Sequence, residues 1–297
     1  MARRKRRNHR GRRSLPSVLT LLLALAVLLG AIGWKYWTEY SLPQPIQGDL
    51  ELHVIDVGQG ESILLRSGTE SMLIDTGLRE AGDDVSEYLQ NLGIQTLDRL
   101  LITHDHSDHR GGIKRVLKDI DTKVLMLYDG GDRDSGYQLA GDLAGSSSCD
   151  IAFVEAGQQF PLGDAVVKVI FPIAGYHTDD LNDESVVLLV ECGGKRILLT
   201  SDSTAAAELL YYEDLPTVDV LKVAHHGSGG SSSVDLLKKI RPKLALISCG
   251  LDNDYGHPHD RVTQALAALG AEVYRTDKQG DLVVTLKDGA LTVKTQR

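Results

Sequence analysis

The sequence reads Thr103-His104-Asp105-His106-Ser107-Asp108-His109-Arg110-Gly111-Gly112 at its most informative point. Three histidines and two aspartates fall within six consecutive residues of this stretch. The residues before it, 98–102, predict the end of a strand, and those after it, 111–119, predict a helix. The polar cluster is therefore expected on a strand-to-helix loop, where rigid elements typically hold functional side chains. This density of ligand-type side chains indicates a metal site rather than an ordinary solvated loop.

The spacing of these residues predicts two neighbouring metal positions. We expect His104 and His106 to converge on one ion, and Asp108 with His109 to face a second position. Mixed nitrogen and oxygen ligands suit zinc, manganese or iron. The predicted cofactor is one or two divalent metal ions, with zinc favoured and manganese as the alternative.

Further motifs follow along the chain and narrow the interpretation. They are VIDVGQGES (54–62), LIDTG (73–77), NDES (182–185), LLTSD (198–202), LKVAHHGS (221–228) and YGHP (255–258). The HxHxDH spacing at 104–109 resembles the metallo-β-lactamase superfamily of hydrolases. Together with DVGQG, HHGS and YGHP, it resembles the metallo-hydrolase domain of ComEC-type DNA-uptake proteins and of stand-alone relatives that lack the channel. The resemblance covers about residues 50–295.

This resemblance implies a mixed α/β fold, the four-layer αββα sandwich, and a set of metal ligands. Asp202 is expected to bridge both metals, and Ser201 stands where the family usually has glycine. His225 is preferred over His226 as a ligand, but neighbours on a strand face opposite sides, so the sequence leaves that choice open. The implied ligands are His104, His106, Asp108, His109, Asp202 and His225.

The chain departs from the superfamily pattern at one position. Many members carry a further ligand histidine before the bridging aspartate, but His177 is the only histidine in that interval. The NDES motif matches ComEC-type relatives, so we do not assign His177 as a ligand. The first metal position then has only His104, His106 and Asp202 as protein ligands.

Other residues are expected to contact the substrate or to support the ligands. Asp75 is expected to accept the second N–H of a metal-bound histidine. His257 is assigned a catalytic role at a phosphate or leaving-group oxygen, the alternative being an exposed loop histidine, as expected for His259. Turn chemistry is the alternative role for several of the supporting residues. The supporting set is Asp56, Gln59, Asp75, Asn182, Ser185, His226, Ser228 and Tyr255.

Hydrophobic patterning predicts strands and helices that alternate along the rest of the chain. Such a pattern is typical of packed sheets with helices outside. Strands are expected at 51–57, 62–66, 71–75, 98–102, 123–128, 151–155, 165–171, 186–191, 196–200, 218–223, 244–248, 271–275, 281–286 and 290–294. Helices are expected at 83–92, 111–119, 203–212, 233–240 and 260–269.

The N-terminal region predicts a membrane anchor. Eight arginines and lysines lie within the first 13 residues, and an apolar run of 17 residues follows at 18–34. Such a run is just long enough to span a bilayer, and the basic block favours the cytoplasmic side. The predicted organisation is a basic cytoplasmic segment (1–13), a transmembrane signal anchor (14–37), a linker (38–48) and a hydrolase domain (49–297) outside the cytoplasmic membrane. A cleaved signal peptide and a secreted domain is the alternative.

Charge divides between these parts. Nine of the 32 basic residues precede Trp37, whereas all 41 acidic residues follow it, so the exported part has a net charge of −18. An acidic body does not bind nucleic acid by broad electrostatics. A phosphodiester substrate would depend on the metals and on a local basic patch of Lys222, Lys238, Lys239, Arg241 and Lys243. The three cysteines lack CxxC spacing, which indicates buried thiols rather than a structural zinc site or a disulfide framework.

The predicted function is that of a metal-dependent hydrolase, a phosphodiesterase or nuclease that acts on DNA through a metal-activated hydroxide. Asp108 would orient or deprotonate the attacking water. A separate DNA-uptake channel is a possible partner, and the oligomeric state is left open. Two alternatives remain: hydrolysis of another phosphoester, a lactone or an acyl ester, and a membrane-tethered module that binds metal without catalysis.

Overall fold

The structure is a computed structural model that describes residues 18–40, 44–128 and 149–297, with side chains described at 22–35, 44–128 and 149–297. The chain divides into two compact units, 1–42 and 43–297. The expected basic segment, 1–13, lies outside the described residues, as does the start of the expected anchor.

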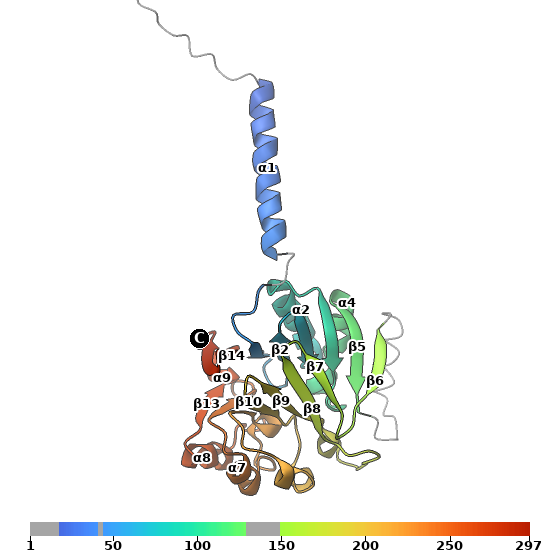
Figure 1. Cartoon of the computed structure of the whole chain (residues 1–297), viewed down its shortest axis with the longest axis vertical. Helices are drawn as coiled ribbons and strands as arrows, with labels where there is room; N and C mark the ends of the chain where they lie inside the picture. Colours follow the sequence, from blue (N-terminus) through green and yellow to red (C-terminus); the bar gives the residue numbers. More distant parts are fainter. Residues whose placement is uncertain (1–17, 41–43, 129–148) are drawn as a thin grey trace, which may run out of the picture. The chain divides into compact units, whose positions relative to one another are not determined.

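The described residues of the first unit form the helix α1 (Val18–Tyr40), drawn in blue in Figure 1. Leucine and alanine dominate its first half, and both residues favour helix. Where side chains are described, no helix is both long enough and apolar enough to cross a membrane. Because both ends of α1 lie beyond that part, the anchor at 14–37 stays a prediction.

The second unit is built on two sheets. Within the described ranges, one sheet has eight strands in the order β15-β14-β1-β2-β3-β4-β5-β6 and the other has seven in the order β13-β12-β11-β10-β9-β8-β7. The first comprises β1 (Leu50–Val54), β2 (Ile63–Ser67), β3 (Glu70–Ile74), β4 (Thr96–Leu101), β5 (Asp121–Leu127), β6 (Asp150–Phe153), β14 (Leu282–Lys287) and β15 (Ala290–Thr295). The second comprises β7 (Gln159–Leu162), β8 (Ala165–Phe171), β9 (Val187–Cys192), β10 (Lys195–Leu199), β11 (Val220–Lys222), β12 (Leu244–Ile247) and β13 (Glu272–Arg275).

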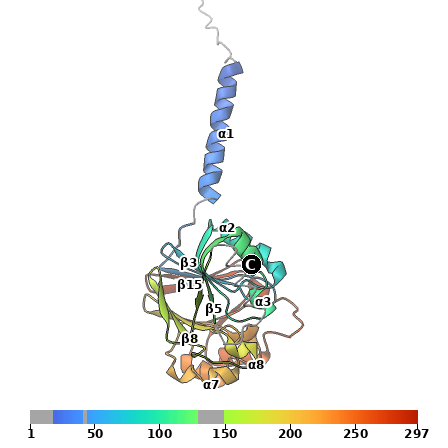
Figure 2. The ribbon, with the colours of Figure 1, turned by 90° about the vertical axis from the view of Figure 1, so that its right-hand side faces the viewer.

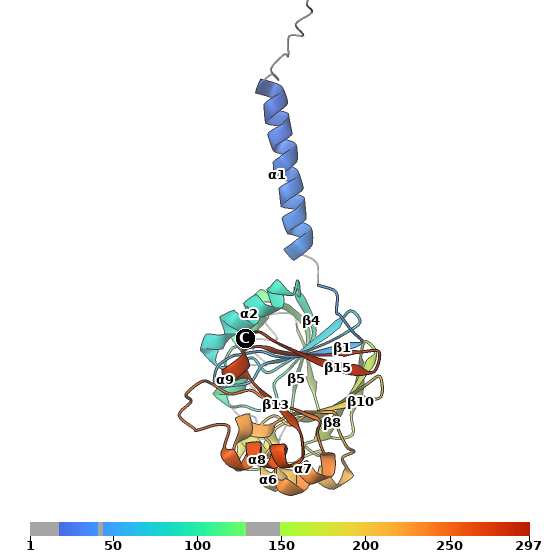
Figure 3. The same ribbon diagram turned by 90° about the vertical axis from the view of Figure 1, so that its left-hand side faces the viewer.

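Helices cover the outer faces of the two sheets. Their bounds are α2 (Gly82–Asn91), α3 (Ser107–Arg110), α4 (Ile113–Asp119), α6 (Ala205–Glu208), α7 (Val234–Ile240), α8 (Asp260–Ala268) and α9 (Thr276–Gln279). Short 3-10 helices are η1 (Arg79–Ala81), η2 (Leu181–Glu184), η3 (Tyr212–Asp214) and η4 (Ala224–Gly227). Figures 2 and 3 show α2 on one side of the sheets and α7 and α8 on the opposite side. The four-layer αββα fold expected from the sequence is confirmed.

The layers are held together by alternating side chains. Along β1, Leu52 and Val54 point between the sheets and pack in one buried cluster with Leu188 and Val190 of β9. A strand with period-two alternation places every second side chain on the same face, so two apolar faces close on one another. Separate buried clusters join each sheet to its own helices. Cys149, Cys192 and Cys249 are free, buried thiols, as expected.

Parallel strands at the centre of each sheet determine where the loops meet. Strands β3, β4 and β5 run parallel in the first sheet, and β10, β11 and β12 run parallel in the second. Loops that leave the carboxyl ends of parallel strands gather at one edge, where α/β proteins bind their ligands.

Some expected elements are wrong in extent. The helix expected at 111–119 begins only at Ile113 as α4, because Gly111 and Gly112 separate it from the short α3, which had no sequence prediction. A Cβ at Gly111 would lie 2.4 Å from the carbonyl oxygen of Ser107, and one at Gly112 would lie 2.4 Å from that of Thr76. The helix expected at 203–212 is only the short α6, and β7 and α9 had no sequence prediction. Strand β7 has an edge position and contains Pro161, which weakens its strand pattern.

Candidate metal centre

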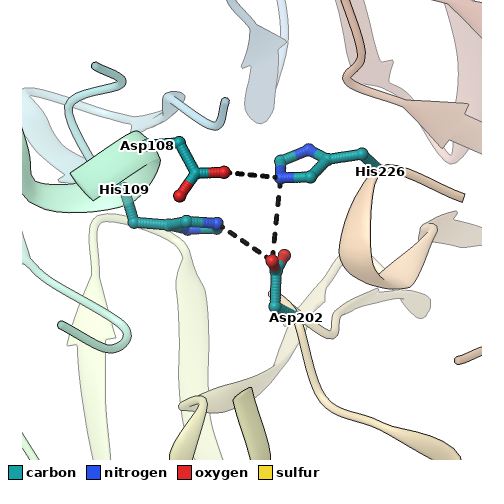
Figure 4. A group of neighbouring side chains, drawn as sticks. All are labelled: Asp108, His109, Asp202 and His226. Atoms are coloured by element: carbon teal, nitrogen blue, oxygen red, sulfur yellow. Dashed lines mark ion pairs between the residues drawn. The ribbon is translucent and has the colours of Figure 1, made fainter. Parts of the chain in front are cut away.

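Four side chains from three loops converge at the carboxyl edge of the sheets. Asp108 and His109 lie on α3 after β4, Asp202 follows β10, and His226 lies on η4 after β11 (Figure 4). One potential ligand atom from each residue lies within 4.8 Å of all the others. His109, Asp202 and His226 are buried, and Asp108 is partly exposed. The group thus joins loops of both sheets around one point.

His109 is oriented by a buried carboxylate behind it. Its Nδ1 donates to Asp75 Oδ2 at 2.7 Å. Asp75 also accepts the backbone N–H of Thr103 at 2.8 Å and the Thr103 hydroxyl at 2.7 Å. The imidazole therefore presents Nε2 to Asp202, whose Oδ2 lies 3.3 Å away. This is the arrangement that holds a metal-binding histidine in one tautomer.

His226 is oriented in the same way by a backbone carbonyl. Its Nδ1 donates to the carbonyl oxygen of Ser248 at 3.0 Å. Because a carbonyl only accepts, Nδ1 carries a hydrogen, so Nε2 is the ring nitrogen that could bind a metal ion. That Nε2 lies 3.3 Å from Asp108 Oδ2 and 3.7 Å from Asp202 Oδ2.

The inner atoms of this group lack hydrogen bonds. Within the described part of the chain, His109 Nε2, His226 Nε2 and Asp202 Oδ1 are buried and have no hydrogen-bond partner. Leaving such atoms unsatisfied costs about 1–3 kcal/mol each, so folded proteins rarely do so. A divalent cation would satisfy all three at once, with Asp108 as a further oxygen ligand. The donor set therefore fits a metal ion.

The charges of the group are strongly coupled. Burial raises the pKa of Asp202, but the positive charges of His109 and His226 outweigh burial and hold that pKa well below its usual range. Burial lowers the pKa of His109, but Asp202 and Asp75 outweigh it and raise that pKa well above its usual range. A proton on His109 Nε2 thus takes the position that a metal would occupy, and metal binding must release it.

His104 and His106 lie beside this group and face each other. Nε2 of His104 is 3.0 Å from Nδ1 of His106, and the rings of His104 and His109 are 4.2 Å apart. Nδ1 of His104 is near the hydroxyls of Thr103 at 3.2 Å and Ser185 at 3.4 Å. Burial lowers the pKa of His104 well below its usual range, which keeps its ring neutral. The pair offers two nitrogen atoms next to the four-residue group.

The sequence pattern that defines the metallo-β-lactamase superfamily matches residues 55–251 of this chain, a range that contains the four converging side chains. The chain belongs to the metallo-β-lactamase superfamily. This assignment agrees with the superfamily of hydrolases that the sequence resembles.

Individual relatives add detail to the family assignment. The chain is 32% identical over 258 residues to ComE operon protein 3 of Bacillus subtilis, covering 80% of this chain and 33% of that protein. It is 31% identical over 293 residues to competence protein ComA of Neisseria gonorrhoeae, covering 94% of this chain and 40% of that one. Recombination protein 2 of Haemophilus influenzae is 30% identical over 252 residues, with 83% and 30% covered. The chain therefore spans only about a third of the length of the curated relatives it matches.

Solved structures of low sequence identity share the fold. CmlA, a diiron beta-hydroxylase from Streptomyces venezuelae, superposes with a TM-score of 0.57 at 17% identity, covering 82% of this chain and 55% of CmlA. YhfI of Bacillus subtilis, a metallo-beta-lactamase fold protein, does so with a TM-score of 0.54 at 15% identity, covering 82% of this chain and 99% of YhfI. At these identities the likeness concerns the fold alone.

The converging group contains His226, whereas the sequence favours His225 as the ligand. Nε2 of His225 lies 3.6 Å from Asp202 Oδ2, and its side chain is 28% exposed, whereas that of His226 is 1% exposed. The preference assumed that the pair ends a strand, but both residues lie in η4 with left-handed backbone angles, φ 51° and 55°. His226, which the sequence placed in the supporting set, therefore lies among the candidate ligands in this geometry.

Other predicted residues lie around the mouth of the centre. Gln59 places Nε2 3.5 Å from Nδ1 of His257 and accepts the N–H of Gly250 through Oε1 at 3.1 Å. The ring of His257 stacks on that of His226 with centroids 6.2 Å apart, and Tyr255 stacks on His257 at 5.5 Å. These side chains from the DVGQG and YGHP motifs thus form one wall beside the metal ligands.

Four predicted residues differ in how they relate to the centre. Ser185 is buried, and its hydroxyl accepts the N–H of Asp202 at 3.3 Å. The hydrogen bonds of the others are made elsewhere: Asp56 with Arg297 at 2.6 Å, Ser228 with the N–H of Gly230, and Asn182 through its N–H to Asp180. Ser185 is therefore the residue of the four that supports a ligand directly.

The prediction that Lys222 belongs to a basic patch for a phosphodiester substrate is wrong. Lys222 is fully buried, and its ammonium group pairs with Glu61 and donates to the carbonyl of Val223. It cannot reach a substrate. His177 pairs with Glu184 at 2.7 Å, in agreement with its exclusion from the ligands.

Sequence reasoning missed three residues that orient the centre. Ser248 supplies the carbonyl behind His226, and the hydroxyls of Ser201 and Thr103 meet at 2.7 Å beside Asp75. Thr103 and Ser201 directly follow predicted strands and Ser248 is the last residue of one, so this shared position at strand ends was a signal that could have identified them.

Proposed function

We propose that this protein is a zinc-dependent phosphodiesterase that cleaves DNA outside the cytoplasmic membrane. The observation that carries the proposal is the convergence of His109 Nε2, His226 Nε2 and Asp202 Oδ1, buried atoms without hydrogen bonds, beside the partly exposed Asp108. Relatives named as competence and recombination proteins support DNA as the substrate. Two nitrogen and two oxygen donors support zinc, and manganese is the alternative.

The chemistry divides between the metal and the side chains around it. A divalent ion would supply Lewis-acid stabilisation of charge on a phosphoryl oxygen and would lower the pKa of water. Asp108 has a side chain that is 28% exposed, so it can accept a hydrogen bond from the attacking water. Burial raises the pKa of Asp108, but the proximity of the His226 ring and the charge of His109 outweigh burial and lower it. Asp108 is thus ionised at neutral pH and orients water as an acceptor.

His257 is suited to contact the substrate as a neutral group. Burial and the nearby charges of His226 and His225 lower its pKa to about 4. A neutral imidazole can accept or donate a hydrogen bond at a phosphate or leaving-group oxygen without protonation. We assign it that contact in the proposed reaction.

The proposal includes a location and a partner. Eight basic residues within the first 13 and the apolar run at 18–34 support a single-pass anchor with the hydrolase domain outside. The resemblance to ComEC-type DNA-uptake proteins, together with a relative named as a competence protein, supports a separate DNA-uptake channel as the partner. Because the exported part carries a net charge of −18, we expect DNA binding to be weak and local rather than broadly electrostatic.

The test is metal-dependent cleavage of labelled DNA by the full chain in detergent, loaded with Zn²⁺ or Mn²⁺. Asp108→Ala and His226→Ala are expected to lower kcat/KM more than about a hundredfold, since each removes a group of the centre. His177→Ala is the matched control, because His177 pairs with Glu184 instead. Absence of DNA cleavage by the metal-loaded protein, with hydrolysis of a small phosphoester, lactone or acyl ester, would replace this proposal with the broader hydrolase.

A further inference from the structure

The loop after β12 presents an aromatic ring to solvent beside the metal centre. Tyr255 is 66% exposed, whereas its neighbour in the YGHP motif, His257, is buried. A single exposed aromatic side chain needs no explanation by itself, but this one borders the candidate metal centre. Tyr255 is not needed to orient His257, because Gln59 already holds His257.

A stack of three rings begins at Tyr255 and ends at one of the metal ligands. The rings of Tyr255 and His257 stack with centroids 5.5 Å apart and planes at 19°. The rings of His257 and His226 stack at 6.2 Å and 29°, and His226 belongs to the metal group. One face of the tyrosine therefore covers His257, and the stack leads directly to the centre.

The loop is held rigidly in this form. Asn253 Nδ2 donates to the carbonyls of Gly250 at 2.9 Å and His257 at 2.7 Å, while its Oδ1 accepts the N–H of His257 at 2.9 Å. The N–H of Gly250 is in turn bound by Gln59. A ring that is fixed before binding loses little entropy when a planar ligand stacks on it.

We propose that Tyr255 is a stacking platform for a nucleobase of an unpaired strand whose phosphodiester lies at the metal centre. This inference rests on the proposed phosphodiesterase function and deepens it by naming the substrate class. Bases inside a duplex already stack on each other, whereas unpaired bases are free to stack on aromatic side chains. Stacking also needs no positive charge, which suits an exported part with a net charge of −18. Tyr255 thus selects single strands or frayed ends.

The test compares two ligands that differ only in their bases. Oligothymidylate and an oligomer of the same length with abasic sites throughout are bound to the full chain, in the zinc-loaded Asp108→Ala background that blocks cleavage. Tyr255→Ala is expected to weaken binding of oligothymidylate about tenfold or more and to leave the abasic oligomer within about twofold, whereas Tyr255→Trp retains both. Leu251→Ala is the matched control, since Leu251 is 69% exposed on the same loop and has no aromatic ring to stack on a base.

The outcomes distinguish a failure of the stacking platform from a failure of the proposed phosphodiesterase function. Equal weakening for both oligomers, or none, overturns the platform and leaves Tyr255 as a support for His257. Base-dependent binding without cleavage by the wild-type chain would instead overturn the phosphodiesterase and retain the platform. When cleavage is present, kcat/KM of Tyr255→Ala should fall for single strands and remain within about twofold for blunt duplex.

Discussion

At the scale of single residues, Ser201 shows how this chain adjusts a family position. It stands where the family resemblance implies glycine, and it has a left-handed φ of 45°, which a residue with a side chain adopts at a cost. Its hydroxyl donates to Thr103 Oγ1 at 2.7 Å, and the Thr103 hydroxyl donates to the Asp75 carboxylate that holds His109. The serine thus extends the hydrogen-bond chain behind a metal ligand.

Replacing Ser201 separates the hydroxyl from the backbone strain. Ser201→Ala keeps the strain and loses the hydrogen bond, so we expect it to lower the free energy of unfolding by about 1–2 kcal/mol. Ser201→Gly loses the same bond but relieves the strain, so its loss should be smaller by about 0.5–1 kcal/mol. Urea denaturation with a chelator measures both. Zinc affinity should fall in both variants alike, by about tenfold; a Ser201→Gly protein less stable than Ser201→Ala would contradict the strain argument.

At the scale of elements, η4 decides which histidine enters the centre. His225, His226 and Gly227 have successive left-handed angles, which reverse the chain directly after β11. Bonds from the His225 N–H to Ser201 at 2.8 Å and from the His259 N–H to Gly227 at 2.9 Å hold this turn. The turn is so tight that a Cβ on Gly227 would lie 2.4 Å from Pro258 Cβ.

Gly227→Ala should therefore disrupt the centre through the backbone. Strain and overlap together are expected to cost about 3 kcal/mol or more and to displace His226, so added zinc should no longer raise Tm. Gly256→Ala is the control, since Gly256 has a φ of 71° but a Cβ there would meet no described atom within 4 Å, and it should cost about 1–2 kcal/mol. Thermal melts with zinc and with chelator measure both effects. A zinc-dependent rise of Tm in Gly227→Ala equal to that of wild type would show that η4 does not need this tight contact.

At the scale of the whole molecule, a buried ion pair ties the two sheets together. Lys222 ends β11 in the second sheet, and Glu61 lies between β1 and β2 of the first. Their side chains are 0% and 1% exposed. The N–H of Glu61 also donates to the carbonyl of Asp108 at 3.0 Å, so the pair supports the loop that carries two metal ligands.

Replacing one partner of the ion pair should lower the free energy of unfolding more than replacing both partners. Lys222→Met leaves a buried carboxylate without its partner, and we expect it to lower the free energy of unfolding by about 3–5 kcal/mol. The double variant Lys222→Met with Glu61→Leu should regain most of that loss, because no charge stays buried alone. Chemical denaturation of the wild type, both single variants and the double variant in a double-mutant cycle measures the coupling. Additive losses would show that the two charges do not depend on each other.

The sequence by itself determined the fold class and the region of the centre. The HxHxDH loop between a strand and a helix, and Asp202 at the end of a strand, carry their signal in a few consecutive residues. Short-range patterns of this kind depend on local periodicity and turn chemistry, which a single sequence displays. Strand alternation likewise indicated the packed sheets before their order was known.

Only the tertiary structure decided the contacts that make these residues a centre. The choice of His226 depends on a left-handed turn that is stabilised by Ser201 and His259, residues distant in the chain. The burial of Lys222 depends on Glu61, which is 161 positions away, so composition alone suggested an exposed cation. The orientation and burial of these side chains are fixed only when loops from distant parts of the chain pack together. The hydrogen bonds and the low dielectric constant of the site depend on that packing, so they leave no local pattern in the sequence.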